Sequence, residues 1–335
     1  MINLKKIGLT ALAGSLVAIS ANAVEMSVSG TSEISYVSKG GTGVAGYGPA
    51  DVEGNPWGSN TSISFSGSGD VGFGTATIVR TLNDGLGSHV SQYTTINMDD
   101  LGTLSFDSSG GALEGLTAKD DLLPTAYEEA WNGVSSSGVS GAASNNTWGY
   151  SNSVMGLDIS LAHSKGGTGG SGDQATSGEG LTGSTTDIYL SHTGMIEGLT
   201  LAVGNSQAEL KDGLATTTDS STTLGRAVYA MGPVSVGYQV AEVNNGAAGT
   251  ATTDIAGYSI AFNVNDNLSV SYGRYDKEVA AIGATAAVTE ESTGISGAYT
   301  SGAATVRFTS NEASNAGNAV GRTQEHTEIS LVLAF

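Results

Sequence analysis

A two-residue alternation of apolar and polar side chains recurs along almost the whole chain and limits its fold more than any other feature. In the last nine residues, TEISLVLAF, one parity holds Ile329, Leu331, Leu333 and Phe335, while the other holds mostly small or polar residues. Alternate side chains of a β-strand point to opposite faces, so each such segment predicts a strand with one apolar face. Strands of this kind throughout the chain favour an all-β fold, a transmembrane antiparallel β-barrel that is apolar towards lipid and polar towards water. Closure is required because an unpaired sheet edge is unstable in hydrocarbon.

The connections between the alternating segments follow a rhythm of their own. The spacing of the segments predicts about sixteen strands, an even number that leaves both chain ends on one side of the membrane. Tight turns such as MG, GP, NDN and SG alternate with long polar stretches, which are expected at the outer rim. The long stretches are Gly40–Gly58, Gly110–Asn146, Lys165–Ser184, Glu209–Ser221, Asn244–Ala251, Glu278–Thr289 and Asn311–Thr323.

The first residues have the pattern of an export signal. Lys5 and Lys6 precede the apolar run IGLTALAGSLVAIS, which ANA follows. A basic start, an apolar stretch and a small-residue cleavage site predict a signal peptide at residues 1–23, cut after Ala23, with an amphipathic N-terminal anchor as the alternative. The run is too short for a spanning helix, which needs about 20 apolar residues. Residues 24–335 are then expected to form the transmembrane β-barrel.

The charge of the chain excludes one class of partner. The formal net charge is −20, and losing Lys5 and Lys6 with the signal peptide brings it to −22. A nucleic-acid-binding protein needs Lys and Arg to neutralise phosphates, so this balance argues against nucleic acid. The chain has no cysteine, so neither disulfides nor thiolate chemistry can contribute.

Taken together, these features resemble a known family. The start VEMSVSG, about sixteen strands, one outsized third loop and the terminal SLVLAF are similar to the Gram-negative general porin family, in particular the trimeric sixteen-stranded outer-membrane porin of the alphaproteobacterial type. The resemblance implies a homotrimer in the outer membrane, in contact with its lipid and lipopolysaccharide. It also implies that the barrel-assembly machinery reads Phe335, and that the first and last strands pair to close the barrel.

The third long stretch, about residues 110–146, differs from its surroundings. It contains a proline followed by helix-compatible residues, PTAYEEAW, and is rich in acids. The resemblance implies that this loop folds into the barrel and narrows the pore; a solvated acidic loop at the outer rim is the alternative. The charged candidates for the constriction are Glu114, Lys119, Asp120, Asp121, Glu128 and Glu129.

Strand parity supplies candidates for the pore wall. Arg307 lies between Val306 and Phe308, and an Arg facing lipid at mid-membrane costs about 2–4 kcal/mol, so Arg307 is expected to face the lumen. For the same reason Arg226 and Arg80 are expected to point inward. Arg274 shares the parity of outward residues, so we expect it beyond the hydrocarbon at the end of its strand; a bulge that resets the register is the alternative. The acids expected on the lumenal face are Glu33, Asp107, Asp158 and Glu328.

These expectations define a function. We expect an outer-membrane porin, a water-filled channel for passive diffusion of small hydrophilic solutes and ions, with carboxylates that favour cations. The alternatives are a substrate-selective porin for one nutrient class and a surface adhesin barrel. No enzyme is expected, because the four histidines are scattered without ligand spacing and the glycine-rich GSGDVGFG lies in a hairpin turn. No cofactor is expected. Acids beside Gly in the outer loops leave Ca²⁺ binding there as an alternative.

Overall fold

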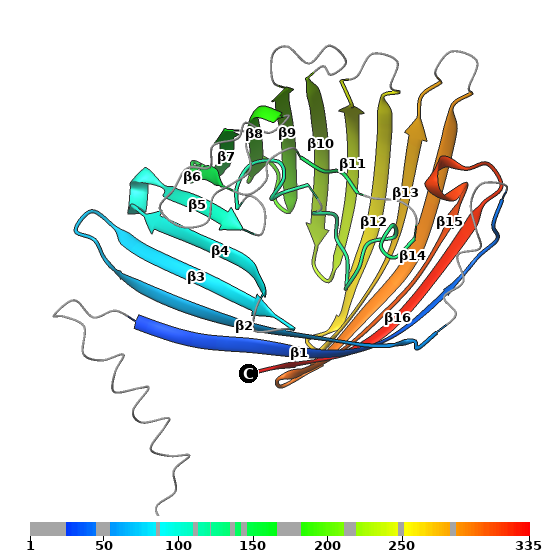
Figure 1. Ribbon diagram of the computed structural model, residues 1–335, viewed down its shortest axis with the longest axis horizontal. Helices are drawn as coiled ribbons and strands as arrows, with labels where there is room; N and C mark the ends of the chain where they lie inside the picture. The colour runs from blue at the N-terminus through cyan, green and yellow to red at the C-terminus, as the bar shows by residue number, and fades with distance from the viewer. Residues whose placement is uncertain are drawn as a thin grey trace, which may run out of the picture.

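The computed structural model describes residues 25–44, 54–84, 88–109, 113–120, 122–134, 138–141, 146–165, 182–210, 219–246, 251–281 and 286–335. The predicted signal peptide therefore lies outside the described residues. Sixteen antiparallel strands form one closed barrel, in which each strand pairs with its neighbours in sequence and β1 pairs with β16 (Figure 1). The prediction of a closed barrel of about sixteen strands is confirmed. The strands are β1 (Glu25–Gly40), β2 (Trp57–Asp70), β3 (Thr75–Asn83), β4 (Ser88–Asn97), β5 (Thr103–Ser109), β6 (Thr147–Val154), β7 (Leu157–Lys165), β8 (Thr182–Thr193), β9 (Leu199–Leu210), β10 (Ser220–Met231), β11 (Val234–Asn244), β12 (Thr253–Asn265), β13 (Leu268–Val279), β14 (Val288–Ser301), β15 (Ala304–Ser314) and β16 (Thr323–Ala334).

The connections at one rim of the barrel are short, and those at the opposite rim are longer except between β3 and β4. Met155 and Gly156 join β6 to β7 with φ values of 54° and 83°. Two consecutive positive φ values match the right-handed twist of the paired strands, as in a type I′ turn. At the opposite rim, residues 110–146 between β5 and β6, called loop 3 below, form the longest connection.

The helical content of the described residues is small. It consists of two 3₁₀ turns, η1 (Asp99–Leu101) and η2 (Ala316–Asn318). Residues 124–131 of loop 3, which have helix-compatible side chains, form turns and bends instead of a helix, because the loop is held by contacts with the barrel wall. Among the described residues, no helix is both long and apolar enough to cross a membrane.

The outward face of the strands is apolar over a band that suits lipid. Residues of one parity along β11 to β16 leave large apolar side chains exposed, as the alternation predicts. They include Val236, Tyr238, Val240, Tyr258, Ile260, Phe262, Val270, Tyr272, Ile295, Tyr299, Val306, Ile329, Leu331 and Leu333.

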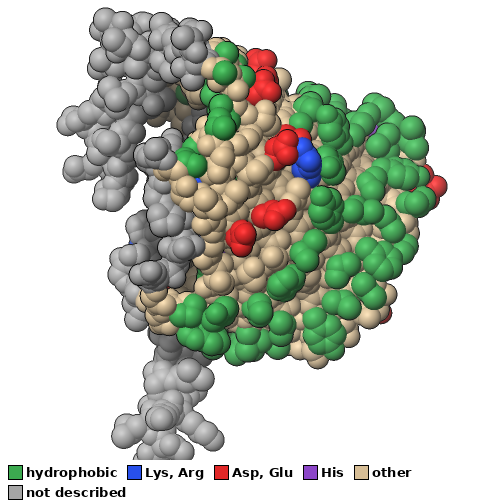
Figure 2. Space-filling view, turned by 90° about the vertical axis from the view of Figure 1, so that its right-hand side faces the viewer, with side chains coloured by type: hydrophobic (Ala, Val, Ile, Leu, Met, Phe, Trp, Pro, Cys, Tyr) green, Lys and Arg blue, Asp and Glu red, His purple; other side chains and the backbone are tan. Residues whose placement is uncertain are grey.

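Acidic side chains and a neighbouring base gather on one part of the outer face, apart from most of the hydrophobic side chains (Figure 2). Arg274 belongs to such a group, because its guanidinium lies 2.8 Å from Asp276 and 3.2 Å from Glu291. The pairing of β13 is continuous on both sides of Arg274, so no bulge resets the register. Arg274 therefore faces outward among carboxylates in the middle of β13, and its expected position beyond the hydrocarbon stays a prediction.

Candidate pore constriction

Loop 3 runs inside the barrel along the wall that β7 to β15 form. Near its start, the Gly115 amide donates to the Ser160 hydroxyl of β7 at 2.7 Å. The Thr117 amide then donates to the carboxylate of Asp187 on β8 at 2.9 Å, and the hydroxyls of Thr117 and Ser206 also bond to Asp187. Asp187 is completely buried, and these donors satisfy its oxygens, as a buried carboxylate requires.

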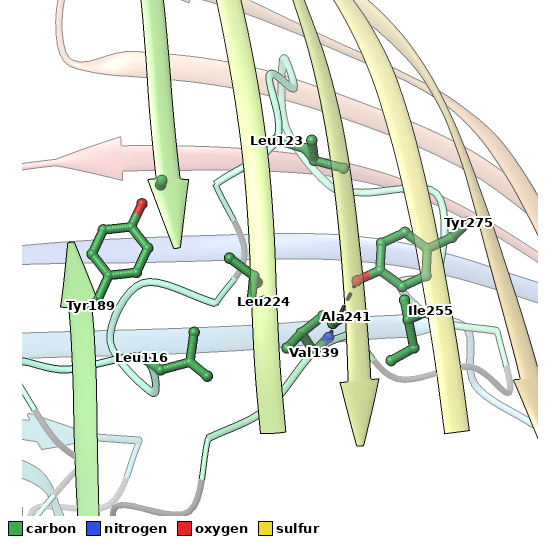
Figure 3. Packing of buried hydrophobic residues seen from close by; sticks show 9 residues of the cluster. Leu116, Leu123, Val139, Tyr189, Leu224, Ala241, Ile255 and Tyr275 are labelled. Carbon is green, nitrogen blue, oxygen red and sulfur yellow. Dashed lines mark hydrogen bonds between the residues drawn. The ribbon is translucent and has the colours of Figure 1, made fainter. Parts of the chain in front are cut away.

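An apolar patch on the inner wall holds the middle of loop 3. Leu116, Leu123 and Val139 of the loop are buried against inward side chains of the wall (Figure 3). The amide of Val139 also donates to the Tyr275 hydroxyl at 3.2 Å. Burial of apolar side chains contributes about 1.5–3 kcal/mol each, so the patch stabilises the loop against the wall. The wall residues of the patch are Tyr189, Ala202, Leu224, Ala241, Ile255 and Tyr275.

Arg226 of β10 fastens the loop where it leaves the wall. Its guanidinium donates to the backbone carbonyls of Lys119 at 2.6 Å and of Asp120 at 3.1 Å. The same group donates to the Tyr189 hydroxyl at 2.7 Å and to the side-chain oxygen of Gln239 at 3.1 Å. Arg226 points inward, as expected, but it is only 6% exposed. It is therefore a residue that anchors the loop, whereas the sequence indicated a basic group on the open pore wall.

Side chains of β13 to β15 hold the far end of the loop. The amides of Ala126 and Tyr127 donate to the hydroxyls of Ser271 and Ser296, at 2.9 and 3.2 Å. The side-chain amide of Asn311 donates to the backbone carbonyls of Glu129 and Asn132, both at 2.9 Å. Loop 3 is thus attached at many points, which fixes the width of the pore.

Glycines on the inner wall allow loop 3 to lie close. A Cβ on Gly237 of β11 would come within 2.5 Å of Pro124 and 2.9 Å of Leu123. A Cβ on Gly204 of β9 would come within 2.6 Å of Leu116. Because carbon atoms in contact lie about 3.5–4.0 Å apart, a larger residue at either position would push the loop into the lumen.

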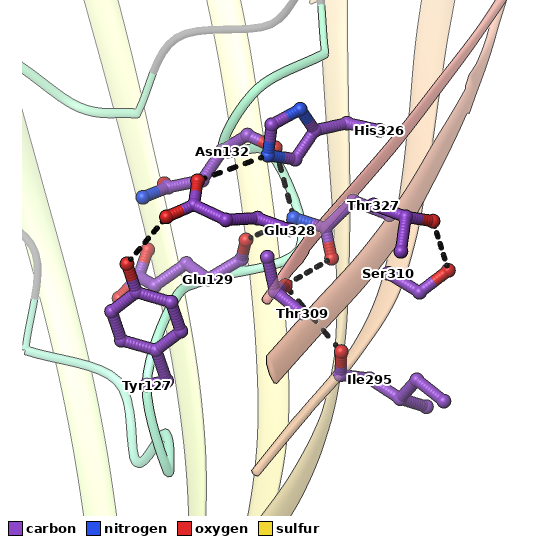
Figure 4. A network of polar contacts seen from close by, with 10 residues as sticks. Tyr127, Glu129, Asn132, Ile295, Thr309, Ser310, His326, Thr327 and Glu328 are labelled. Carbon is purple, nitrogen blue, oxygen red and sulfur yellow. Dashed lines mark hydrogen bonds and ion pairs between the residues drawn. The ribbon is translucent and has the colours of Figure 1, made fainter. Parts of the chain in front are cut away.

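Carboxylates meet where the end of loop 3 reaches β16 and β1. The Tyr127 hydroxyl donates to Glu328 at 3.1 Å, and Glu328 lies 3.6 Å from the His326 imidazole (Figure 4). Glu128 belongs to the loop and not to a spanning strand; burial, and then the negative charges of Glu328 and Glu33, raise its pKa. The guanidinium of Arg307 lies 5.0 Å from the centre of the Tyr127 ring, in a cation–π arrangement.

The inner wall on β2 and β3 is lined by hydroxyls. Ser64 and Thr81 are cross-strand partners with their hydroxyl oxygens 2.8 Å apart, and they alternate with outward residues such as Phe65. Among the described side chains on the inner face of β1 to β4, Lys39 is the only base. This part of the lumen therefore has no cluster of arginines.

The acids assigned to the wall from parity point inward, but they lie at different heights. Glu33 and Glu328 occur in the carboxylate group near the end of loop 3. Asp107 of β5 is 2% exposed, with a carboxylate oxygen 2.7 Å from the Ser109 amide. Asp158 of β7 lines a separate cavity of about 660 Å³ with Glu114 and Lys119 of the loop.

The remaining charged candidates of loop 3 have other positions. The backbone carbonyl of Asp120 accepts from Arg226, and Asp121 lies outside the described residues. The carboxylate of Glu129 accepts from the Trp131 indole at 2.6 Å.

The expectation for Arg80 is not met. Arg80 of β3 pairs with Phe65 of β2, and paired residues lie on the same face of a sheet. Phe65 is exposed on the outer face, as is Ile78, which has the parity of Arg80. The register turns Val79 inward, and the two adjacent apolar residues in TIVR do not reveal which of them faces lipid.

Sequence reasoning missed the wall residues that hold loop 3, above all Asp187, Tyr189 and Tyr275. One signal was present. On β8, β10 and β12 large apolar residues occur at both parities, whereas a strand whose inner face meets open water has apolar residues at the outward parity alone. A stretch such as DIYL, with Ile188 outward and Tyr189 inward, indicates that something packs on the inner face.

Comparison with known proteins agrees with this architecture. A porin refined at high resolution aligns over 93% of this chain and 100% of its own length, at 13% identity and a TM-score of 0.67. OmpF of Salmonella typhi, in complex with daunomycin, aligns over 92% of this chain and 97% of its own length, at 13% identity and a TM-score of 0.64. An anion-selective porin from Comamonas acidovorans aligns over 93% of this chain and 100% of its own length, also at 13% identity and a TM-score of 0.64. At these identities the likeness concerns the fold.

A search of curated protein sequences gives no match. The family model described as Gram-negative porin matches residues 8–308, which is most of the chain. The closed barrel of sixteen strands and the inward-folded third loop agree with that match, and the chain therefore belongs to the Gram-negative porin family.

Proposed function

We propose that the chain forms a water-filled outer-membrane channel for passive diffusion of small hydrophilic solutes and ions, and that this channel prefers cations. Membership of the porin family and the closed barrel support the channel. The observation that carries the preference is the group of Glu33, Glu128 and Glu328 at the end of loop 3.

The balance of charge around this group favours cations. Among the described residues, Arg307 and Lys39 are the bases near it, so three carboxylates outnumber two cations. The inner wall on β2 and β3 adds hydroxyls and no positive charge. Rings and arrays of acids raise the local concentration of cations, and a narrow passage strengthens the effect because it focuses the field.

The reversal potential of the protein in a planar bilayer between unequal KCl solutions tests the proposal. We expect a potential of the sign given by excess K⁺ flux, and a smaller potential for Glu128→Gln. Chelator in both solutions keeps bound divalent ions from changing the charge of the pore. A wild-type potential of the opposite sign would refute the cation preference.

Glu242→Gln provides the matched control. Glu242 lies on the outer face of β11, so this substitution removes the same charge from the same barrel outside the lumen. We expect its reversal potential to equal that of the wild type. An equal change in both variants would mean that the total charge of the protein, and not the constriction, sets the preference.

We also propose that the protein works as a homotrimer in contact with lipopolysaccharide. Family membership supports this. Native electrophoresis of unheated protein in mild detergent, together with chemical cross-linking, tests the oligomeric state. Monomers at all protein concentrations would contradict the trimer.

We further propose that Phe335 is recognised by the barrel-assembly machinery. The side chain is 69% exposed at the end of the chain, where a partner can reach it. Phe335→Ala is expected to lower the amount of folded barrel in the outer membrane without changing the amount synthesised. Equal amounts of folded barrel would contradict the proposal.

A further inference from the structure

Three potential metal ligands converge where loop 3 meets the last strand. Glu128 comes from the loop, whereas His326 and Glu328 come from β16, two residues apart and therefore on the same inner face. One donor atom from each of the three lies within 4.8 Å of the other two. Among the described residues, this is the one group of three or more His, Cys, Asp or Glu side chains with such spacing.

The histidine is buried and held in place. His326 is 4% exposed, and its Nδ1 is buried without a hydrogen-bond partner. The ring lies against the backbone at Gly133 of loop 3, which has a φ of 73° and no space for a Cβ. The other ring nitrogen, Nε2, faces Glu328 at 3.6 Å. An imidazole fixed in this way needs little rearrangement to bind a metal ion through Nε2.

Two oxygens near the end of loop 3 also lack partners. The side-chain oxygen of Asn132 and one carboxylate oxygen of Glu33 are buried and make no hydrogen bond. Buried polar atoms are nearly always paired, because leaving one unpaired costs about 1–3 kcal/mol. The unpaired oxygen of Asn132, whose side chain bonds to Glu128, would be satisfied by a cation bound beside the two carboxylates.

The chemistry of the donors selects the kind of cation. Two carboxylate oxygens and an imidazole nitrogen suit zinc and the neighbouring divalent transition metals, whereas Ca²⁺ and Mg²⁺ prefer oxygen ligands alone. Zinc binds nitrogen and oxygen at about 2.0–2.2 Å, so its ligand atoms stand roughly 3.3 Å apart. The separation of His326 and Glu328, 3.6 Å, is close to that value, and a donor atom of Glu128 lies within 4.8 Å of both.

We propose that Glu128, His326 and Glu328 form a binding site for a divalent transition-metal ion of the zinc type, which ties loop 3 to the last strand inside the pore. Tyr127, whose hydroxyl donates to Glu328, orients that ligand, and Asn132 supplies an oxygen for a fourth position. The proposal does not depend on the selectivity of the channel, because metal binding is measured directly.

Isothermal titration of the mature, untagged protein in detergent with ZnCl₂ tests this site. We expect one Zn²⁺ per chain for the wild type and binding weaker by at least about tenfold for His326→Gln, since even outer-shell changes weaken metal binding by 10–100-fold. His163→Gln is the matched control, because His163 is exposed on the outer face of β7. It is expected to bind as the wild type does.

The other outcomes are equally informative. No Zn²⁺ binding by the wild type, or equal binding by His326→Gln, would overturn the proposal. Ca²⁺ binding as tightly as Zn²⁺ would also overturn it, because the nitrogen donor would then have no role. If His326→Gln does not yield a folded barrel, judged by its migration in unheated gels, Glu128→Gln decides: lost binding supports the site and retained binding refutes it.

Discussion

Gly30 of β1 and Phe335, the last residue of the chain, exchange two backbone hydrogen bonds. The Gly30 amide donates to the Phe335 carbonyl at 2.8 Å, and the Phe335 amide donates back at 2.9 Å. These bonds continue the ladder between β1 and β16, so the C-terminal residue takes part in closing the barrel. An aromatic ring at this position requires a glycine opposite, since a Cβ on Gly30 would lie 2.7 Å from two ring carbons.

Gly30→Val should therefore weaken closure. The added side chain meets the Phe335 ring and, at 2.9 Å, the backbone oxygen of Ser62. Overpacking of this kind costs about 1–3 kcal/mol. The temperature at which the barrel loses its compact electrophoretic form should fall. Gly67→Val, at an outward glycine with open space around it, should lose this form at the same temperature as the wild type. Equal transition temperatures for the two variants would contradict the role of the ring.

Arg226→Lys should loosen loop 3 while leaving the barrel intact. Lysine is a single point charge and cannot reproduce the fork of donors that bridges the carbonyls of Lys119 and Asp120. Each lost bond to a charged group costs about 1.5–3 kcal/mol. Single-channel recordings should show larger fluctuations of the open-channel current. Arg274→Lys, on the outer face, serves as the control, and quiet currents in both variants would contradict the anchoring role.

Gly237→Val should narrow the pore. The valine side chain would occupy the space of Pro124 and Leu123, so the loop must shift towards the lumen. We expect a lower single-channel conductance. Gly225→Val gives the comparison, because a Cβ there meets only Val240, at 3.8 Å. Unchanged conductance of Gly237→Val would mean that the wall yields instead of the loop.

Arg307→Gln should change ion selectivity in the direction opposite to Glu128→Gln. Removing this cation leaves the nearby carboxylates less compensated, so the preference for K⁺ should increase. The loss of its contact with the Tyr127 ring costs about 0.5–2 kcal/mol and should not unfold the barrel. Reversal potentials measure the change. Arg274→Gln removes the same charge outside the pore, and a shift as large in that variant would contradict the assignment.

Much of the barrel could be predicted from sequence because its determinants are local. Period-two alternation places each strand, and turn residues end it: loop 3 was expected at residues 110–146, and β5 ends at Ser109 while β6 begins at Thr147. Arg307 could be assigned to the lumen because Val306 and Phe308 flank it. Arg80 could not, because Ile78 and Val79 are both apolar and only pairing with Phe65 decides the face.

The contacts of the constriction could not be predicted for a different reason. Arg226 binds carbonyls of residues that precede it by 107 and 106 positions, and Asp187 holds a threonine 70 positions earlier. Such pairs are fixed by the path of the loop through the barrel, which no periodicity encodes. The burial of Tyr275 and Leu224 likewise depends on where the loop rests.

The unequal lining of the lumen acts on molecules that carry no net charge. A zwitterion or other dipolar solute passing between the hydroxyls of β2 and β3 and the carboxylates beside loop 3 enters a lateral gradient of potential. The gradient turns the positive end of the molecule towards Glu128 and Glu328 and the negative end towards the serines. Orientation during transit thus follows from the placement of acids on one side of the passage.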